Sequence, residues 1–230
     1  HLEALCAYVR EKRLPLGVAF DGDADRCLCV NENGEVVDGD FIMAICARDM
    51  LRRGKLARKT VVGTIMANMG FSKFCEENGI NFIPTKVGDR YVLEEMEMEG
   101  YCFGGEQSGH VIFRDFATTG DGQLTAVQLL AHLKQENLTL AEAAKVMKRY
   151  PQTMINVNVS HDGKLAFYMD AEVKRAIEEG KARLAENGRV VARVSGTEPL
   201  IRVMVEAAED TLCEKYVDQV VDVMKAQGLV

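Results

Sequence analysis

Apolar residues recur along the chain with two spacings, one typical of strands and one typical of helices. Between residues 37 and 149, short apolar runs alternate with longer amphipathic segments. This alternation predicts crossover units around a mainly parallel or mixed sheet with helices on its faces. The expected strands are residues 59–65, 80–84, 101–105 and 111–113, and the expected helices are 41–53 (capped by Asp40 and stopped by Gly54), 68–78, 91–99, one from about Asp121, and one ending near Arg149.

The segments on either side of this region carry a different pattern. A short amphipathic helix over 1–13 and strands over 16–20 and 27–31 are expected first, and Asn33-Gly34 is a strong hairpin signal. Tyr150-Pro151 marks a boundary, after which the sequence predicts a compact α+β unit. Its expected elements are a strand at 151–160, a helix at 164–186, strands at 189–194 and 200–207 around a turn at 195–199, and a last helix from 210.

The predicted fold class is therefore α/β, a mixed-sheet α/β domain followed by a smaller α+β C-terminal domain. We expect boundaries that give residues 1–36, 37–150 and 151–230 as three segments. The composition agrees, because 47% hydrophobic and 27% charged residues are ordinary for a globular chain.

Charge and cysteine content exclude several classes of protein. The net charge of −7, from 28 Lys+Arg against 35 Asp+Glu, argues against a nucleic-acid-binding face. A run of ~18 apolar residues is absent, so we expect no membrane span. The seven cysteines lie mostly in apolar runs and Cys27-x-Cys29 lacks a second pair at zinc-ligand spacing, so they predict buried thiols in a reduced cytoplasmic setting.

The first segment with chemical content is DGDADR at residues 21–26. Asp21, Asp23 and Asp25 alternate with small residues between two apolar strands. Three carboxylates converge only around a strong positive charge, which a hard divalent cation supplies, and Mg²⁺ leaves room for a phosphate oxygen. Arg26 stands beside the acids, where it could hold the same phosphate.

Two other interpretations of this segment remain. In an EF-hand counted from Asp21, Glu32 falls at the twelfth position, but Arg26 occupies the sixth, where that loop needs Gly. The strand-like flanks also disagree with an EF-hand. A solvated acidic turn with no ligand is the other alternative.

The second segment is GEQSGH at residues 105–110, between two expected strands. Glu106 and Ser108 alternate, so both could face one ligand, and a carboxylate with a hydroxyl suits sugar hydroxyls. His110 could donate to phosphate or carry a proton, although a buried histidine with a structural role is as good an interpretation.

The third segment is RVSGTEPLIR at residues 193–202. Ser195, Gly196 and Thr197 predict a tight turn whose backbone N–H groups and hydroxyls could hold an anion. Arg193 and Arg202 on the flanking strands could clamp phosphate oxygens. A hairpin turn with two surface arginines is the alternative.

The fourth segment is TKVGDR at residues 85–90. Lys86 and Arg90 bracket Gly88 just before an expected helix, so cations and a helix N-terminus could meet a phosphate there. Ordinary polar residues at a helix start are the alternative.

Together, DGDADR, GEQSGH and RVSGTEP resemble, in this order, the metal, sugar and phosphate loops of the α-D-phosphohexomutase superfamily. The finer wording (TKVGDRYVLE, GGEQSGH, TTGDG, VSGTEPLIRVMVEA) is similar to its bacterial phosphoglucosamine mutase branch. The resemblance covers essentially the whole chain but only the second half of such four-domain enzymes. It therefore implies the end of a second domain at 1–36, the third domain at 37–150 and the fourth at 151–230.

The resemblance implies a specific chemistry. Magnesium on the three aspartates would activate a phosphoserine for transfer to glucosamine 6-phosphate, and a 1,6-bisphosphate intermediate would yield glucosamine 1-phosphate, for UDP-N-acetylglucosamine and peptidoglycan. Glu106 and Ser108 would bind the sugar. The non-reacting phosphate would be held by Arg193, Ser195, Gly196, Thr197 and Arg202. Arg90 would lie near the substrate, and Arg26, Lys86 and His110 near the reacting groups, with acid–base roles unassigned.

One departure from the family is large. The serine-centred loop of the family is nowhere in these 230 residues, which begin at His1 without Met. We therefore expect a fragment without turnover, monomeric although the full-length enzyme could be a homodimer. A phosphomannomutase/phosphoglucomutase of the same superfamily and a non-catalytic phosphosugar- or metal-binding module are the alternative functions.

Overall fold

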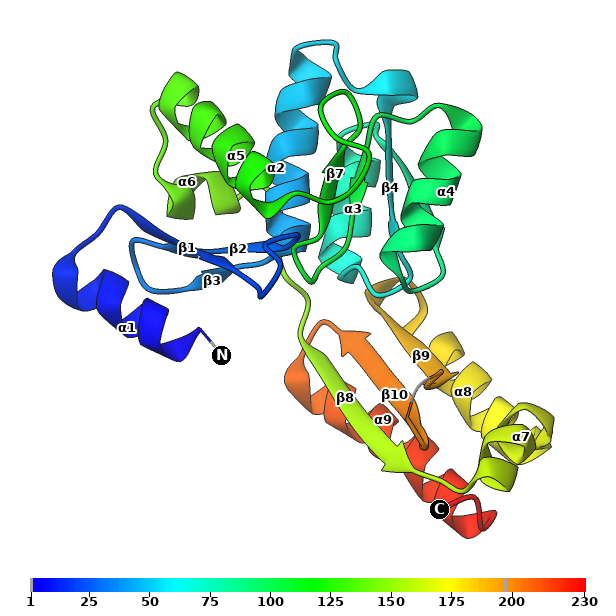
Figure 1. Ribbon diagram of the computed structural model, residues 1–230. Coiled ribbons are helices and arrows are strands. Elements are labelled where there is room, and N and C mark those ends of the chain that lie inside the picture. The colour runs from blue at the N-terminus through cyan, green and yellow to red at the C-terminus, as the bar shows by residue number, and fades with distance from the viewer. Residues whose placement is uncertain (1, 197) are drawn as a thin grey trace. The chain divides into compact units, whose positions relative to one another are not determined.

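The chain divides into two units, with the boundary between Lys148 and Arg149. The computed structural model describes residues 2–196 and 198–230. Unit 1 comprises His1–Lys148 and unit 2 comprises Arg149–Val230 (Figure 1).

Unit 1 contains a four-stranded mixed sheet. The strands follow the order β5 (Asn81–Thr85), β4 (Thr60–Thr64), β6 (Phe103–Gly105), β7 (Val111–Phe113). β4 pairs in parallel with β5 and β6, whereas β7 runs antiparallel to β6 because only a short loop joins them. The predicted mixed α/β architecture is confirmed.

Alternation along the strands decides which helix covers which face of this sheet. Val61 and Phe103 point into the larger core, shared with α2 (Gly39–Arg52), α3 (Met69–Glu77) and α5 (Gly122–Glu136). Val62 points the other way, toward α4 (Asp89–Glu99), which Figure 1 shows at the side of the sheet away from α2. Gly104 lies under α4, where a Cβ would come within 2.8 Å of the sulfur of Met96, so a larger residue would push the helix away.

The first residues of unit 1 form a second, antiparallel sheet. It consists of β1 (Leu16–Phe20), β2 (Cys27–Asn31) and β3 (Val36–Val37), preceded by α1 (Glu3–Lys12). The predicted turn at Asn33-Gly34 joins β2 to β3, and Gly34 has a φ of 78°, which favours glycine. Cys27 and Cys29 of β2 are buried in the larger core, which also receives Val37 and most of α2.

The cap of α2 differs from the prediction. Asp38, not Asp40, caps this helix, since its carboxylate accepts hydrogen bonds from the backbone N–H of Asp40 (3.2 Å) and Phe41 (3.4 Å). Asp40 lies in the first turn and is fully buried, and its carboxylate accepts instead from the backbone N–H of Asn68 at 2.7 Å. Proximity in sequence could not tell these two neighbouring aspartates apart.

Two further helix boundaries were predicted wrongly. α4 begins at Asp89, two residues before the predicted start at Tyr91, so Arg90 is helical. The helix expected to end near Arg149 is only α6 (Leu140–Ala144), because the N–H groups of Lys145 and Val146 bond three residues back and tighten the chain out of the helix. The carbonyl of Lys148 then packs where a Cβ on Gly70 would lie.

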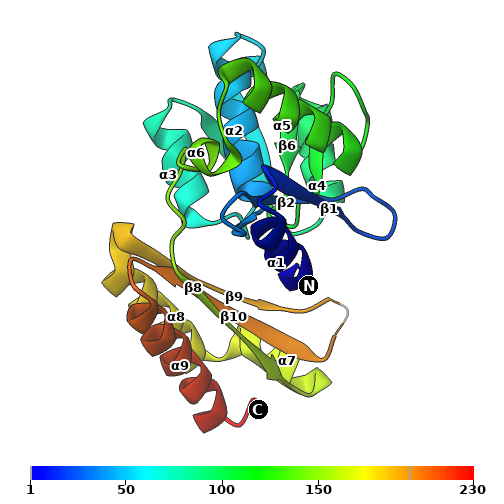
Figure 2. The same cartoon turned by 90° about the vertical axis from the view of Figure 1, so that its left-hand side faces the viewer.

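Unit 2 is a three-stranded antiparallel sheet with helices, as Figure 2 shows. The strand order is β8 (Gln152–Asn158), β10 (Leu200–Ala207), β9 (Gly188–Val194), and α8 (Ala171–Leu184) and α9 (Asp210–Ala226) pack on Ile201, Val203 and Val205 of the central strand. The helix predicted over 164–186 is two helices, α7 (His161–Met169) and α8. Asp170 separates them in an extended conformation and caps α8 through the N–H of Val173 at 2.9 Å.

Two short 3₁₀ helices complete the described elements, η1 (Ala57–Lys59) and η2 (Ala185–Asn187). No helix within the described residues is long and apolar enough to cross a membrane.

Candidate functional site

The acidic loop of residues 21–26 joins β1 to β2. Asp21, Asp23 and Asp25 each bring a carboxylate oxygen within 4.8 Å of the others. Ala24 has a φ of 60°, the left-handed conformation that L-residues other than Gly rarely adopt, and this curl turns alternate side chains toward one centre. The structure thus brings together the three predicted carboxylates.

This loop fits a hard divalent cation. Asp25 Oδ1 is buried and accepts no hydrogen bond from any described residue, although a buried carboxylate oxygen ordinarily has a partner. Asp21 and Asp23 are exposed beside it. Three oxygen ligands with open space around them are what Mg²⁺ requires when it also keeps waters or a phosphate oxygen.

Arg26 lies against the same carboxylates. Its Nε stands 3.6 Å from Asp21 Oδ2 and 3.9 Å from Asp25 Oδ1, and its backbone N–H donates to Asp21 Oδ1 at 3.3 Å. The side chain is 51% exposed, so the guanidinium is accessible to an anion that approaches the loop.

A second group of possible ligands in the described residues has a different character. Asp49 of α2 and His132 and Glu136 of α5 also lie within 4.8 Å of one another. Both carboxylates are already neutralised, since Arg53 pairs with Asp49 and Arg52 pairs with Glu136 at 3.0 Å. This group is therefore an ion-pair network between two helices, whereas the aspartates of the acidic loop outnumber their one arginine.

The loop of residues 106–110 lies directly against the acidic loop. The backbone N–H of Cys27 donates to the carbonyl of Gly109 at 3.0 Å, and Arg26 and His110 form an antiparallel bridge. Gly109 has a φ of 94°, and a Cβ there would lie 2.3 Å from the carbonyl oxygen of Cys27. The two loops predicted to carry metal and sugar chemistry are therefore held together by main-chain contacts.

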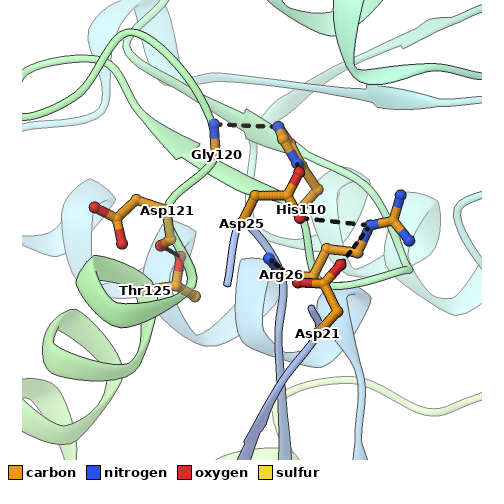
Figure 3. Close-up of polar contacts among 7 residues, drawn as sticks. All are labelled: Asp21, Asp25, Arg26, His110, Gly120, Asp121 and Thr125. Carbon is orange, nitrogen blue, oxygen red and sulfur yellow. Dashed lines mark hydrogen bonds and ion pairs between the residues drawn. The ribbon is translucent and has the colours of Figure 1, made fainter. Parts of the chain in front are cut away.

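His110 is buried and both of its ring nitrogens have partners, as Figure 3 shows. Nδ1 lies 3.0 Å from Asp25 Oδ2, and Nε2 accepts a hydrogen bond from the backbone N–H of Gly120 at 3.1 Å. Because an N–H can only donate, Nε2 is the acceptor of the neutral ring and Nδ1–H donates to Asp25. In this geometry His110 contacts a predicted metal ligand rather than open solvent.

Glu106 connects this loop to the segment at 85–88. Its Oε1 accepts from the backbone N–H of Gly88 at 3.1 Å, at the N-terminus of α4, where the helix dipole favours a carboxylate. Ser108 is exposed, and so is Lys86, whose ammonium lies 5.7 Å from the Tyr91 ring centroid.

Arg90 is engaged elsewhere. Its Nε donates to Glu94 at 2.7 Å on the exposed surface of α4, and this hydrogen bond raises the pKa of the guanidinium. An anion would have to compete with Glu94, so the substrate-binding assignment of Arg90 stays a prediction.

The back of the 106–110 loop is fixed by buried Asp40. Gln107 donates from Nε2 to Asp40 Oδ2 at 3.1 Å, and its carbonyl accepts from the N–H of Gly39 at 3.0 Å. A Cβ on Gly39 would stand 2.1 Å from the carbonyl of Glu106, so only glycine fits at this helix start. No local signal in the sequence indicates that Gly39 and Gln107 position Glu106 through the backbone.

In unit 2, the turn at 195–199 is flanked by two arginines. Arg193 of β9 and Arg202 of β10 are direct cross-strand partners. Each Nε–H is buried and donates to no described residue, and burial, together with the positive charge of Arg202, lowers the pKa of Arg193. Like charges directly opposite each other are destabilising, so this pair favours a bound anion. Glu198 offsets part of that charge through a 2.6 Å contact with Arg202.

The turn itself is held by a few hydrogen bonds. Ser195 is buried, its Oγ accepts from the N–H of Glu198 at 3.2 Å, and its carbonyl accepts from Lys164 Nζ at 2.8 Å. Gly196 is exposed, with nothing within 4 Å of a Cβ. Thr197, predicted to contribute a hydroxyl, lies outside the described residues. Lys164, on α7, was not anticipated, because its distance in sequence from the turn hides the contact.

Comparisons with known proteins agree with these features. Residues 38–150 match the family described as phosphoglucomutase/phosphomannomutase, alpha/beta/alpha domain III, and residues 154–223 match its C-terminal domain. The chain belongs to this phosphohexomutase family. It is similar to the phosphoglucosamine mutase of Anoxybacillus flavithermus (51% identity over 225 residues, 98% of this chain and 50% of the relative) and to that of Alkaliphilus oremlandii (54% over 204 residues, 89% and 45%). It spans about half the length of the relatives it matches.

Solved phosphohexomutase structures share the fold. One is that of Aspergillus fumigatus N-acetylphosphoglucosamine mutase, with a TM-score of 0.76 at 22% identity over 98% of this chain and 52% of that one. Another is the same enzyme in complex with GlcNAc-6P and magnesium, with a TM-score of 0.73 at 21% identity, covering 94% and 52%. At this identity the likeness concerns the fold alone.

Proposed function

We propose that the full-length protein is a phosphoglucosamine mutase that converts glucosamine 6-phosphate to glucosamine 1-phosphate. The reaction would pass through a phosphoserine, which is absent from these residues, and a 1,6-bisphosphate intermediate. The observation that carries the proposal is the packing of the acidic loop against the 106–110 loop through main-chain contacts. The first loop offers carboxylate oxygens for a metal, and the second offers a carboxylate and a hydroxyl suited to a sugar. The phosphoglucosamine mutases that are 51% and 54% identical to this chain support this specificity.

In this proposal Asp21, Asp23 and Asp25 hold Mg²⁺. When bound, the ion would offset negative charge on the phosphoryl group in transfer. The three carboxylates supply oxygen ligands, and Arg26 presents its exposed guanidinium to the same phosphoryl group. A superfamily enzyme crystallised with GlcNAc-6P and magnesium supports this choice of ion.

Binding and orientation are assigned to the other segments. Glu106 and Ser108 would contact sugar hydroxyls. Arg193 and Arg202, with the turn of Ser195, Gly196 and Thr197, would hold the phosphate that does not react, and such remote binding orients the reacting oxygen. Lys86 and Arg90 would approach the substrate from the start of α4. His110 contacts Asp25 and pairs with Arg26, so it would lie next to the transferring group.

Further parts of the proposal concern the chain as a whole. Residues 1–36 would be the end of a second domain, 37–150 a third domain and 151–230 a fourth. The cysteines are unpaired in the described structure, which supports a reducing cytoplasmic location, and a homodimer would form only in the full-length enzyme.

The test compares substrates on the full-length protein. We expect phosphoryl exchange with glucosamine 6-phosphate to exceed that with mannose and glucose 6-phosphates. A preference for the latter would assign a phosphomannomutase/phosphoglucomutase instead. The 230-residue chain assayed alone should give no glucosamine 1-phosphate, and turnover above a no-protein control would contradict the need for the missing serine. If the full-length protein binds but transforms none of the three sugars, a binding module is the correct function.

A further inference from the structure

We propose that the segment Gly120–Gly122, at the start of α5, is a positioning element that fixes the geometry of the metal loop. In the sequence this stretch belongs to the motif TTGDG at residues 118–122. The inference rests on the proposed metal site at Asp21, Asp23 and Asp25. Two backbone N–H groups of the segment carry it: that of Gly120 reaches the loop indirectly through His110, and that of Gly122 bonds directly to Ala24 of the loop, nearly one hundred residues away in the sequence.

The first contact runs through His110. The N–H of Gly120 donates to His110 Nε2 at 3.1 Å, which leaves Nδ1 as the donor toward Asp25 Oδ2 at 3.0 Å (Figure 3). The other oxygen, Asp25 Oδ1, is buried and receives no hydrogen bond from a described residue. The relay therefore occupies one oxygen of Asp25 and turns the other toward the metal position, as hydrogen bonds to metal-ligating side chains do.

The second contact holds the curl of the loop. The N–H of Gly122 donates to the carbonyl of Ala24 at 3.0 Å. Ala24 has the unfavourable φ of 60°, which turns Asp23 and Asp25 to one side. A hydrogen bond to this residue compensates for its backbone strain and keeps the carboxylates convergent.

Both positions require glycine for lack of space. A Cβ on Gly120 would lie 2.4 Å from His110 Nε2, and a Cβ on Gly122 would lie 2.5 Å from the carbonyl oxygen of Arg26. Alanine at either site would displace the His110 ring or the metal loop itself. Gly54, at the end of α2, offers a contrast, because nothing lies within 4 Å of its Cβ position.

The segment is attached to a rigid support. Asp121 caps α5 by accepting from the N–H of Leu124 at 2.9 Å. The hydroxyl of Thr125, which is fully buried, donates to the carbonyl of Asp121 at 2.8 Å. Because these hydrogen bonds hold the start of α5 in place, the residues that contact the metal loop are held in place as well.

The test measures metal binding by the 230-residue chain, with Mn²⁺ alone as a paramagnetic probe detected by water-proton relaxation. We expect Gly120→Ala and Gly122→Ala each to weaken Mn²⁺ binding about 10- to 100-fold, the usual effect of losing a group that orients a metal ligand. Gly54→Ala is the control: Gly54 has a φ of 66°, so alanine strains the backbone there, but its Cβ would meet no other atom of the described residues. This variant should leave Mn²⁺ binding unchanged. Circular dichroism confirms that each variant is folded.

A spectroscopic signature and a rescue separate positioning from general destabilisation. Long-range ¹H–¹⁵N spectra should show His110 as the Nδ1–H tautomer in the wild type and lose that preference in Gly120→Ala. His110→Asn, whose amide can still donate near the Nδ1 position, should retain more Mn²⁺ affinity than His110→Leu. An Nε2–H tautomer in the wild type, or equal affinities for the two His110 variants, would overturn the relay.

The outcomes also distinguish this inference from the proposed function. If Asp23→Asn leaves Mn²⁺ binding intact, the metal site itself is wrong. If Asp23→Asn removes binding while both glycine variants bind as the wild type does, the metal site stands and the positioning role is refuted.

Discussion

The two loop regions of this chain gather charge of opposite sign in different ways. The acidic loop of unit 1 is exposed on one side and closely packed on the other, where Gly109, Gly120 and Gly122 each leave no room for a Cβ. The arginine pair of unit 2 stands on a regular strand pair beside an exposed turn, where a Cβ on Gly196 would meet nothing. Carboxylates on a short irregular loop need rigid surroundings to converge, whereas cross-strand register alone brings two guanidiniums together.

The largest effect is expected at the centre of the acidic loop. Asp23→Asn in the full-length protein removes a full negative charge from a proposed metal ligand, so turnover should fall by about 10²-fold or more. Steady-state kinetics with glucosamine 6-phosphate measures it, with Asp218→Asn on the exposed surface of α9 as the matched control. Near-normal turnover would show that the loop is not the metal site.

Alanine substitutions at Gly109 and Gly196 test the difference in packing between the two regions. Gly109→Ala should lower the free energy of unfolding by about 3 kcal/mol, because a Cβ would meet the Cys27 carbonyl and the φ of 94° disfavours alanine. Gly196→Ala should change it by less than about 0.5 kcal/mol. Urea denaturation of the 230-residue chain measures both, and equal losses would mean that the two regions are packed equally closely.

The arginine pair should affect affinity more than folding. Arg193→Ala in the full-length protein should raise KM about tenfold with a smaller change in kcat, because a remote phosphate contact is lost. Its thermal midpoint should not fall, since the variant also removes a like-charge neighbour of Arg202. Arg175→Ala, on exposed α8, is the control, and unchanged kinetics for Arg193→Ala would remove the clamp assignment.

The smallest effect concerns the core behind the acidic loop. Burial raises the pKa of the Cys46 thiol to about 12 from an ordinary value of 9.0. The folded state therefore keeps a proton that the unfolded state loses, so this contribution to stability is complete below pH 9 and is lost as pH rises toward 12, with a slope of up to about 1.4 kcal/mol per pH unit.

Cys46→Ala should flatten that decline in urea denaturation between about pH 8 and pH 10. Cys6→Ala on α1 serves as the control, because Cys6 is only partly buried. An identical pH dependence in wild type and Cys46→Ala would contradict the assignment.

Much of this protein followed from its sequence. The strand and helix rhythm of residues 37–149 predicted a mixed sheet, since apolar periodicity reports burial locally. The alternation of Asp21, Asp23 and Asp25 predicted convergent carboxylates, because three like charges at short spacing need a common counterion. The misplaced boundaries, at Asp40, Tyr91, Asp170 and after Ala144, all lie where local signals were nearly balanced.

Only the tertiary structure decided which residues support those carboxylates. Gly122 bonds to Ala24, and Gly120 bonds to His110, which in turn reaches Asp25, so both connections end on a loop distant in the chain. Likewise, Lys164 reaches the carbonyl of Ser195 and Gln107 reaches Asp40. A sequence pattern encodes the periodicity of neighbours, but packing fixes long-range hydrogen bonds by main-chain proximity, and a glycine gives no local sign of which backbone will lie against it.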